Sequence, residues 1–307
     1  MEKRDSLLEN PRAVGVACAV AATGLGLAYM AAAGAQVFQL AVNAGALVIG
    51  LAFFALLRPS SGEAPVLPAW ASLACGGALL ATALFGASAE GASRWVRVAG
   101  LSLQISLVLL PPMLVAFARR RDFLSTLGVI MAAAALALQP DRAMAGVLAA
   151  ALAVLALRRR DRWVMSALGI AAAGFTTTLL RPDTLPAVPY VDQILYTAFD
   201  VHVLAGLAVV GGALLLVVPA LPGLRLDPRG ADACAVFGIA WLGVVLAAAL
   251  GNYPTPLVGY GASSVLGYVL SLAFLPGEVP STAAVQTAGL TQRHRDTEER
   301  PLLLSPL

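Results

Sequence analysis

The chain has 307 residues, of which 59% are hydrophobic and only 12% are charged, and its formal net charge is +3. An ordinary soluble domain is excluded, because such domains contain about 25% charged residues. The small positive charge does not indicate a nucleic-acid partner, since it comes from a few arginines beside apolar runs. These runs recur at membrane-spanning length, so the sequence predicts a multi-pass protein surrounded by membrane lipids.

The predicted fold class is all-α, a polytopic membrane helix bundle. Backbone polar groups in lipid must be satisfied within each segment, and the runs are too long and too uniformly apolar for barrel strands. We expect ten spans, at approximately 13–34, 36–57, 69–86, 101–118, 123–139, 143–157, 163–180, 194–221, 232–250 and 261–276. The membrane domain therefore covers residues 13–276, between a cytoplasmic N-terminus (1–12) and a disordered cytoplasmic tail (277–307).

Arginine and lysine residues lie mostly on one side of the membrane when the chain is arranged in these ten spans. Sixteen of the twenty fall on the side of the N-terminus, and only Arg94, Arg97, Arg142 and Arg181 fall on the other. Because positive residues accumulate in cytoplasmic loops, both termini are predicted to be cytoplasmic. Cys18, Cys75 and Cys234 lie within expected spans without metal-ligand spacing, so we expect small apolar filler and no metal site.

The first polar patch along the chain lies between the third and fourth spans. Arg94 and Arg97 flank Trp95, and Gln104 follows shortly after. Two arginines beside a tryptophan suit a phosphate group. The alternative is a tryptophan anchor at the membrane interface with arginines that extend toward the headgroups.

Three more patches follow on the outer side. Asp141 either binds a divalent cation, pairs with an arginine or caps the next helix. Arg181 and Asp183 lie in the next outer loop, and Asp200 lies about two turns inside the eighth span, where a carboxylate needs a partner or a wet cavity. Asp200 is therefore either functional or part of an interhelical hydrogen bond. The last patch is a Gly/Pro-rich loop that leads into a helix and contains Tyr260, Ser263 and Ser264.

Taken in order, these patches resemble the motifs of the SEDS family of cell-wall proteins (the RodA, FtsW and SpoVE type). The segments at 91–96 and 102–106 resemble the family's GAxRWI and SLQPS motifs. The segment Leu138-Gln139-Pro140-Asp141 resembles LQPDLG, and residues 256–264 resemble PLPFVSYGGSS. Leu185, Pro186 and the stretch from Asp192 to Asp200 loosely resemble the family's LPxxxTDFIF motif. The resemblance covers roughly residues 13–276 and implies ten helices with both ends cytoplasmic.

The resemblance also implies a role in peptidoglycan synthesis during cell division or elongation, in the bacterial inner membrane. Family members polymerise the lipid-linked disaccharide lipid II beside a class B penicillin-binding protein. By this resemblance, Asp183 is the expected base, and the expected substrate-binding residues are Arg94, Trp95, Arg97, Gln104, Asp141, Arg181, Asp200, Tyr260, Ser263 and Ser264. A divalent cation is compatible with Asp141, and no organic cofactor is implied.

The chain departs from the family pattern where charge is expected. Only about thirteen residues, 181–193, replace the family's long outer loop, and Leu107 and Leu110 replace a glutamate and a lysine. These losses leave the enzymatic assignment open, although the retained acids favour a glycosyltransferase. The alternatives are a catalytically degenerate scaffold that binds a lipid-linked precursor, and a transporter of such a precursor.

Overall fold

The computed structural model describes residues 10–57, 67–89, 92–98, 100–181, 186–225 and 227–277. The expected N-terminal segment and C-terminal tail lie largely outside these ranges. The α-helices are α2 (Pro11–Ala32), α3 (Val37–Leu57), α4 (Ala69–Phe85), α5 (Ile105–Arg119), α6 (Phe123–Leu138), α7 (Arg142–Arg158), α8 (Arg162–Leu179), α9 (Ile194–Val201), α10 (Val203–Leu215), α11 (Pro228–Leu250) and α12 (Ala262–Ala273). A 3-10 helix, η1 (Val218–Arg225), follows α10.

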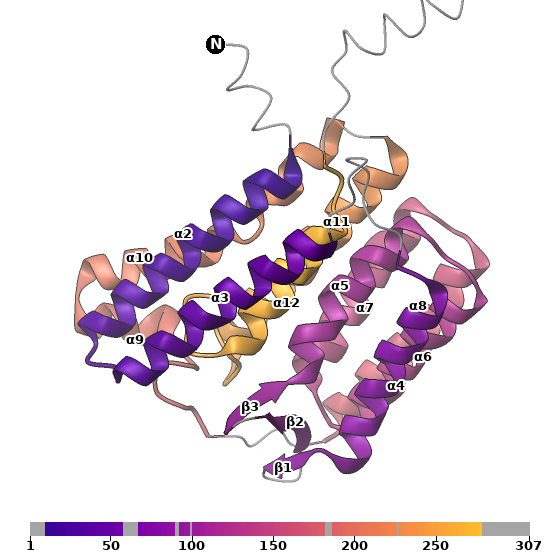
Figure 1. The fold of residues 1–307 in the computed structure, drawn as a ribbon. Helices are drawn as coiled ribbons and strands as arrows, with labels where there is room; N and C mark the ends of the chain where they lie inside the picture. Colours follow the sequence, from indigo (N-terminus) through magenta and orange to yellow (C-terminus); the bar gives the residue numbers. More distant parts are fainter. Residues whose placement is uncertain are drawn as a thin grey trace, which may run out of the picture.

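The long helices pack side by side, and a small sheet closes one end of the bundle (Figure 1). The helix positions confirm the predicted helical bundle, since nine of the ten expected spans coincide with one helix each to within a few residues. Within the described ranges, four helical segments are long and apolar enough to cross a membrane: α2, α3, Val203–Gly223 and α11. The number of crossings and the side of the termini stay predictions.

Aspartates in the loops determine where several helices begin. Asp122 accepts from the Ser125 amide in a capping box, Asp161 accepts from two amides at the start of α8, and Asp227 caps α11 in the same way. Such caps satisfy amides that a helix leaves unpaired at its first turn.

Small residues allow the helices to approach closely. A Cβ atom on Gly76 of α4 would collide with the backbone of Gly128 in α6, and one on Gly128 would collide with the backbone of Ser72. Close backbone approach through glycine is the usual way in which membrane helices associate, because lipid provides no hydrophobic driving force.

The prediction of an all-α fold was wrong at residues 87–104. These residues form an antiparallel sheet of β1 (Ala87–Ala89), β2 (Ala92–Val98) and β3 (Leu101–Gln104), in which Trp95 pairs with Gln104. Helix α5 therefore begins at Ile105, four residues later than expected. Gly100, with a φ of 82°, lies in the tight turn between β2 and β3; this left-handed conformation favours glycine.

The predicted eighth span, 194–221, was also wrong as a single helix. His202 has extended backbone angles and separates α9 from α10, and its Nδ1 accepts from the Leu204 amide as an N-cap. Asp200 consequently lies at the end of a short helix with an exposed side chain. It makes no hydrogen bond or ion pair with the part of the chain that the structure describes. The expectation that Asp200 is held inside the bundle was therefore wrong.

Candidate functional site

A cavity of about 620 Å³ lies between the sheet and the loops that lead into α9 and α12. The sheet and the α12 entrance bring together segments that are about 160 residues apart in the sequence. The lining residues are Val42, Arg94, Trp95, Arg97, Gly100, Leu101, Ser102, Leu103, Gln104, Leu107, Pro186, Val188, Val191, Asp192, Asn252, Tyr253, Pro254, Tyr260, Gly261, Ala262, Ser263 and Ser264.

The two arginines of β2 reach the cavity in different ways. Arg94 is only 2% exposed, and its guanidinium donates from Nη2 to the Pro140 carbonyl oxygen at 2.6 Å and from Nε to the Gln139 carbonyl oxygen at 3.5 Å. Arg94 therefore connects the sheet to the turn between α6 and α7 by hydrogen bonds. Arg97 is exposed and has no hydrogen bond or ion pair with the described residues. Arg97 is thus the more available cation for an anionic ligand.

Behind the cavity, Asp141 sits at the centre of a buried polar network. Its side chain is 0% exposed, and its Oδ2 accepts from Gln104 Nε2 at 3.1 Å and from Ser106 Oγ at 3.0 Å. Its Oδ1 accepts from the Met144 amide and so caps α7. Because both oxygens are used within the protein and Asp141 does not line the cavity, the capping interpretation of this residue is confirmed.

Gln104 connects this network to the cavity. Its amide nitrogen Nε2 donates to the Tyr253 hydroxyl at 2.8 Å, and its backbone N–H donates to Ser263 Oγ at 2.9 Å. Burial, and then the nearby Asp141 carboxylate, raise the pKa of Tyr253 well above its ordinary value. The Tyr253 hydroxyl is therefore protonated at neutral pH and presents a neutral polar group to the cavity.

The entrance to α12 is held by an asparagine from a distant helix. Asn43 in α3 is completely buried; its Nδ2 donates to the Gly259 carbonyl oxygen at 2.7 Å, and its Oδ1 accepts from the Gly261 amide at 2.9 Å. Gly261 has a φ of 154°, a conformation that residues with a side chain rarely adopt. Helix α12 starts at the cavity without a side-chain cap, so its first amides and the positive end of its dipole face the same region as Arg97.

Asp192 is the acidic residue that the described structure places on the cavity wall. Its side chain is buried, and its Oδ2 accepts from the Val188 amide at 2.8 Å in a tight turn. Burial raises the pKa of this carboxyl, while the Val188 hydrogen bond partly opposes the rise. A carboxylate with a raised pKa is a stronger base than an exposed one. The motif resemblance includes Asp192 but predicts Asp183 as the base.

The structure brings most of the sequence-predicted binding residues together. Those on the cavity wall are Arg94, Trp95, Arg97, Gln104, Tyr260, Ser263 and Ser264. Three others lie elsewhere: Asp141 is buried behind the cavity, Asp200 is exposed on α9, and Arg181 is exposed and donates to the Ala137 carbonyl oxygen at 3.5 Å. Asp183 lies outside the described residues.

No group of three histidine, cysteine or acidic side chains within the described ranges could hold a metal ion. The two free oxygens that a cation at Asp141 would need are already engaged by Gln104, Ser106 and the Met144 amide. The observed donor set therefore does not fit a metal at Asp141.

Comparison with known proteins identifies the fold. Two crystal structures of the rod shape determining protein RodA of Thermus thermophilus are similar to this chain. One, an aspartate-to-alanine mutant, has a TM-score of 0.55 and 19% sequence identity, and the match covers 85% of this chain and 95% of that chain. The second has a TM-score of 0.52 and 20% identity, with 85% and 94% covered. No family model and no curated protein matches the sequence.

The fold of this protein is therefore RodA-like, over nearly the whole length of the RodA chain. This agrees with the SEDS resemblance of the motifs and supports a SEDS-like fold. At about 20% identity, a similar fold does not carry the activity with it.

Proposed function

We propose that this protein is a SEDS-type membrane protein of bacterial cell-wall synthesis that transfers sugar from a polyprenyl-diphosphate donor such as lipid II. The observation that carries the proposal is the composition of the cavity wall: the buried carboxylate of Asp192, the exposed guanidinium of Arg97 and the uncapped start of α12 share one cavity. Glycosyl transfer from a diphosphate needs a base and positive charge in the same site.

In this mechanism Asp192 is the general base. Its carboxylate takes the proton from the acceptor hydroxyl as that oxygen attacks the anomeric carbon of the donor sugar. The bond between that carbon and the diphosphate oxygen breaks, and polyprenyl diphosphate leaves with the electron pair. Arg97 and the first amides of α12 stabilise the negative charge on the leaving group, as helix N-termini do for phosphate.

The apolar part of the wall suits the lipid end of such a donor. Leu107 replaces a charged residue of the family and is almost completely buried beside the cavity. The same replacement supports the alternative function, a scaffold that binds a lipid-linked precursor or a class B penicillin-binding protein without catalysis. Asp200 does not support the transporter alternative, because its side chain is exposed on α9 instead of lying inside the bundle.

The deciding experiment is polymerisation of lipid II by purified protein, alone and with a candidate class B penicillin-binding protein. We expect Asp192→Asn to lower the rate about 10² to 10⁴-fold, as the loss of a general base typically does. Asparagine keeps an oxygen that can accept from the Val188 amide, so the loop should fold normally. Asp200→Asn is the matched control and should retain the wild-type rate.

Asp183→Asn tests the base that was predicted from sequence. If this variant loses activity and Asp192→Asn does not, the base is Asp183. If the wild-type protein makes no polymer under any condition while Asp192→Asn still supports its cellular role, the scaffold function is correct.

A further inference from the structure

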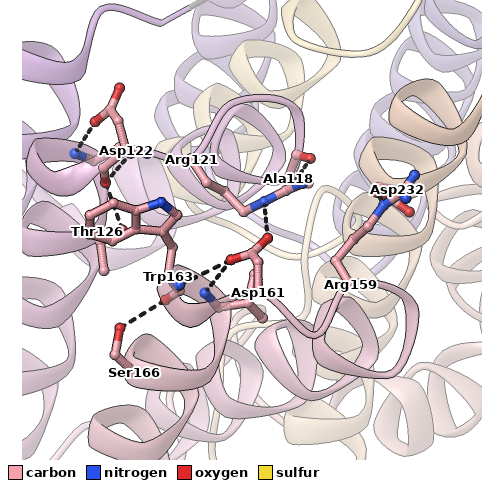
Figure 2. A network of polar contacts seen from close by, with 11 residues as sticks. Ala118, Arg121, Asp122, Thr126, Arg159, Asp161, Trp163, Ser166 and Asp232 are labelled. Atoms are coloured by element: carbon pink, nitrogen blue, oxygen red, sulfur yellow. Dashed lines mark hydrogen bonds and ion pairs between the residues drawn. The ribbon is translucent and has the colours of Figure 1, made fainter.

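A dense group of arginines lies at the end of the bundle away from the sheet. It comprises six residues, here called the arginine cluster, which come from the α5–α6 loop and from the end of α7 to the start of α8: Arg120, Arg121, Arg158, Arg159, Arg160 and Arg162. Figure 2 shows part of this region, with Arg121 directed at Asp161 and Arg159 directed at Asp232. The cluster plays no part in the proposed sugar transfer, which occurs at the other end.

Acidic side chains neutralise only part of this charge. Asp122, Asp161 and Asp232 make ion pairs with arginines of the cluster, and Asp227 interacts electrostatically with Arg159. Six arginines facing four aspartates have a formal charge of +2. Three of the carboxylates are also occupied as helix caps, Asp122 on α6, Asp161 on α8 and Asp227 on α11. Arg160 and Arg162 are exposed and have no acidic partner among the described residues.

Asp232 organises two of the arginines for a further ligand. This carboxylate is 1% exposed, and it accepts from Arg158 Nε at 2.8 Å and from Arg159 Nε at 2.6 Å. Within the described part of the chain, both guanidiniums bond through Nε alone, which leaves their terminal Nη–H groups for another acceptor. Both side chains are partly exposed. Planar guanidiniums held in place in this way suit the oxygens of a phosphate.

Large apolar side chains lie beside these arginines and are open to the surroundings. Leu157, directly before the second arginine run, is 77% exposed, and Phe123, directly after Asp122, is 63% exposed. The Arg162 guanidinium lies over the Trp163 ring, with its Cζ atom 4.4 Å from the ring centroid. Aromatic and basic residues in this combination are typical of the membrane interface, where apolar groups face acyl chains and cations face headgroups.

We propose that the arginine cluster is a binding site for the phosphate headgroup of an anionic glycerophospholipid. The net positive charge selects an anionic over a zwitterionic headgroup, and the exposed Leu157 and Phe123 contact the acyl chains. Basic pockets between membrane helices bind anionic lipid headgroups through this chemistry. Occupation of the site holds α5, α6, α7, α8 and α11 together at that end of the bundle.

The test uses the full-length protein purified in detergent, with retained lipid counted by native mass spectrometry after addition of phosphatidylglycerol or phosphatidylcholine. The double variant Arg160→Gln/Arg162→Gln removes two cluster charges that have no acidic partner among the described residues. At about 1 kcal/mol per arginine, we expect its affinity for phosphatidylglycerol to fall about thirtyfold, with little change for phosphatidylcholine.

Two further variants separate charge from folding. Arg142→Gln/Arg181→Gln removes the same number of charges at the opposite end and should leave the affinity for phosphatidylglycerol unchanged. Arg160→Lys/Arg162→Lys keeps the charge and should retain most of the binding. Equal retention of the two lipids by the wild-type protein would overturn the proposal, as would an equal loss of binding in both glutamine double variants.

Discussion

Asp192 and Asp141 are both buried carboxylates near one cavity, and their hydrogen bonds separate their roles. Asp141 accepts from two side chains and a helix amide, so neither oxygen is available to a ligand. Asp192 accepts from one backbone amide and lines the cavity. A carboxylate used as a structural acceptor and one available for the proposed proton transfer can therefore be told apart by their partners.

The raised pKa of Asp192 gives a pH prediction. Burial favours the protonated carboxyl and so raises the pKa of Asp192. As the pH falls, Asp192 should therefore lose its basic form at a higher pH than an ordinary aspartate does. Polymerisation should therefore decline on the acidic side of its pH–rate profile. The profile should be measured for the wild-type protein and for Asp192→Asn. An identical acidic limb in the residual activity of the variant would contradict this assignment.

Asn43 should be important for stability, because it holds a loop that shapes the cavity. Asn43→Leu would leave the Gly259 carbonyl oxygen and the Gly261 amide without their buried partner. We expect a loss of about 1–3 kcal/mol in the free energy of unfolding, the usual penalty for an unsatisfied buried group. Thermal unfolding in one fixed detergent measures it. Thr176→Val is the control, since the Thr176 hydroxyl is exposed and bonds only within its own helix; an equal effect of the two changes would contradict the role of Asn43.

At the scale of elements, the helix pairs depend on small residues and the connections depend on caps. Helices α4 and α6 touch through backbone atoms at Gly76 and Gly128. Helix α9 is separated from α10 by the extended backbone of His202, and a Cβ atom on Gly206 would collide with the Phe199 ring, so α9 packs closely on α10. The apolar composition of 194–221 gave no indication of this break.

Gly128→Ala should separate α4 from α6. The added methyl group would collide with the Ser72 backbone, which cannot move away as a flexible side chain could. Overpacking of this kind costs about 1–3 kcal/mol, which lowers the melting temperature of a chain of this size by roughly 2–12 °C. Gly24→Ala in α2 is the matched control, because no atom lies within 4 Å of its added methyl group. A Gly128→Ala protein that melts at the control temperature would show that the two helices are not in backbone contact.

At the scale of the whole molecule, arginines lie at the two ends of the helix bundle, where the predicted ten-span arrangement places them. Arg94 contacts the turn before α7, and Arg142 donates to the Arg181 carbonyl oxygen, so these arginines lie together at the sheet end. The arginine cluster occupies the other end, where Arg121 pairs with Asp161. For these arginines of the described ranges, the folded chain agrees with the sorting predicted from sequence, and the membrane side of each end stays a prediction.

Cysteine labelling in intact cells tests this orientation, once Cys18, Cys75 and Cys234 have been replaced. Ser93→Cys, in the sheet, should react with a membrane-impermeant thiol reagent from outside, because the sheet end is predicted to face outward. Arg160→Cys, in the arginine cluster, should react only after the membrane has been permeabilised. Labelling of Arg160→Cys in intact cells would invert the predicted topology.

The sequence by itself determined the helical bundle, most helix positions and the RodA-like fold. Spanning-length apolar runs leave helices as the only stable structure in lipid, and loop aspartates such as Asp161 are recognisable caps. The motif order identified Arg97, Gln104 and Ser263 as site residues, and all three line the cavity.

Only the tertiary structure showed where the described acids lie and how the segment at 87–104 folds. Burial and hydrogen-bond partners depend on segments far apart in the chain, as in the contacts of Asp141 with Gln104 and of Asn43 with Gly261. The sheet was missed because β3 continues directly into the apolar run of α5 and has no separate signal. Asp200 was misplaced because the helix breaks at His202. The His202 side chain accepts from the Leu204 amide and so caps α10, and apolar periodicity does not reveal such a cap.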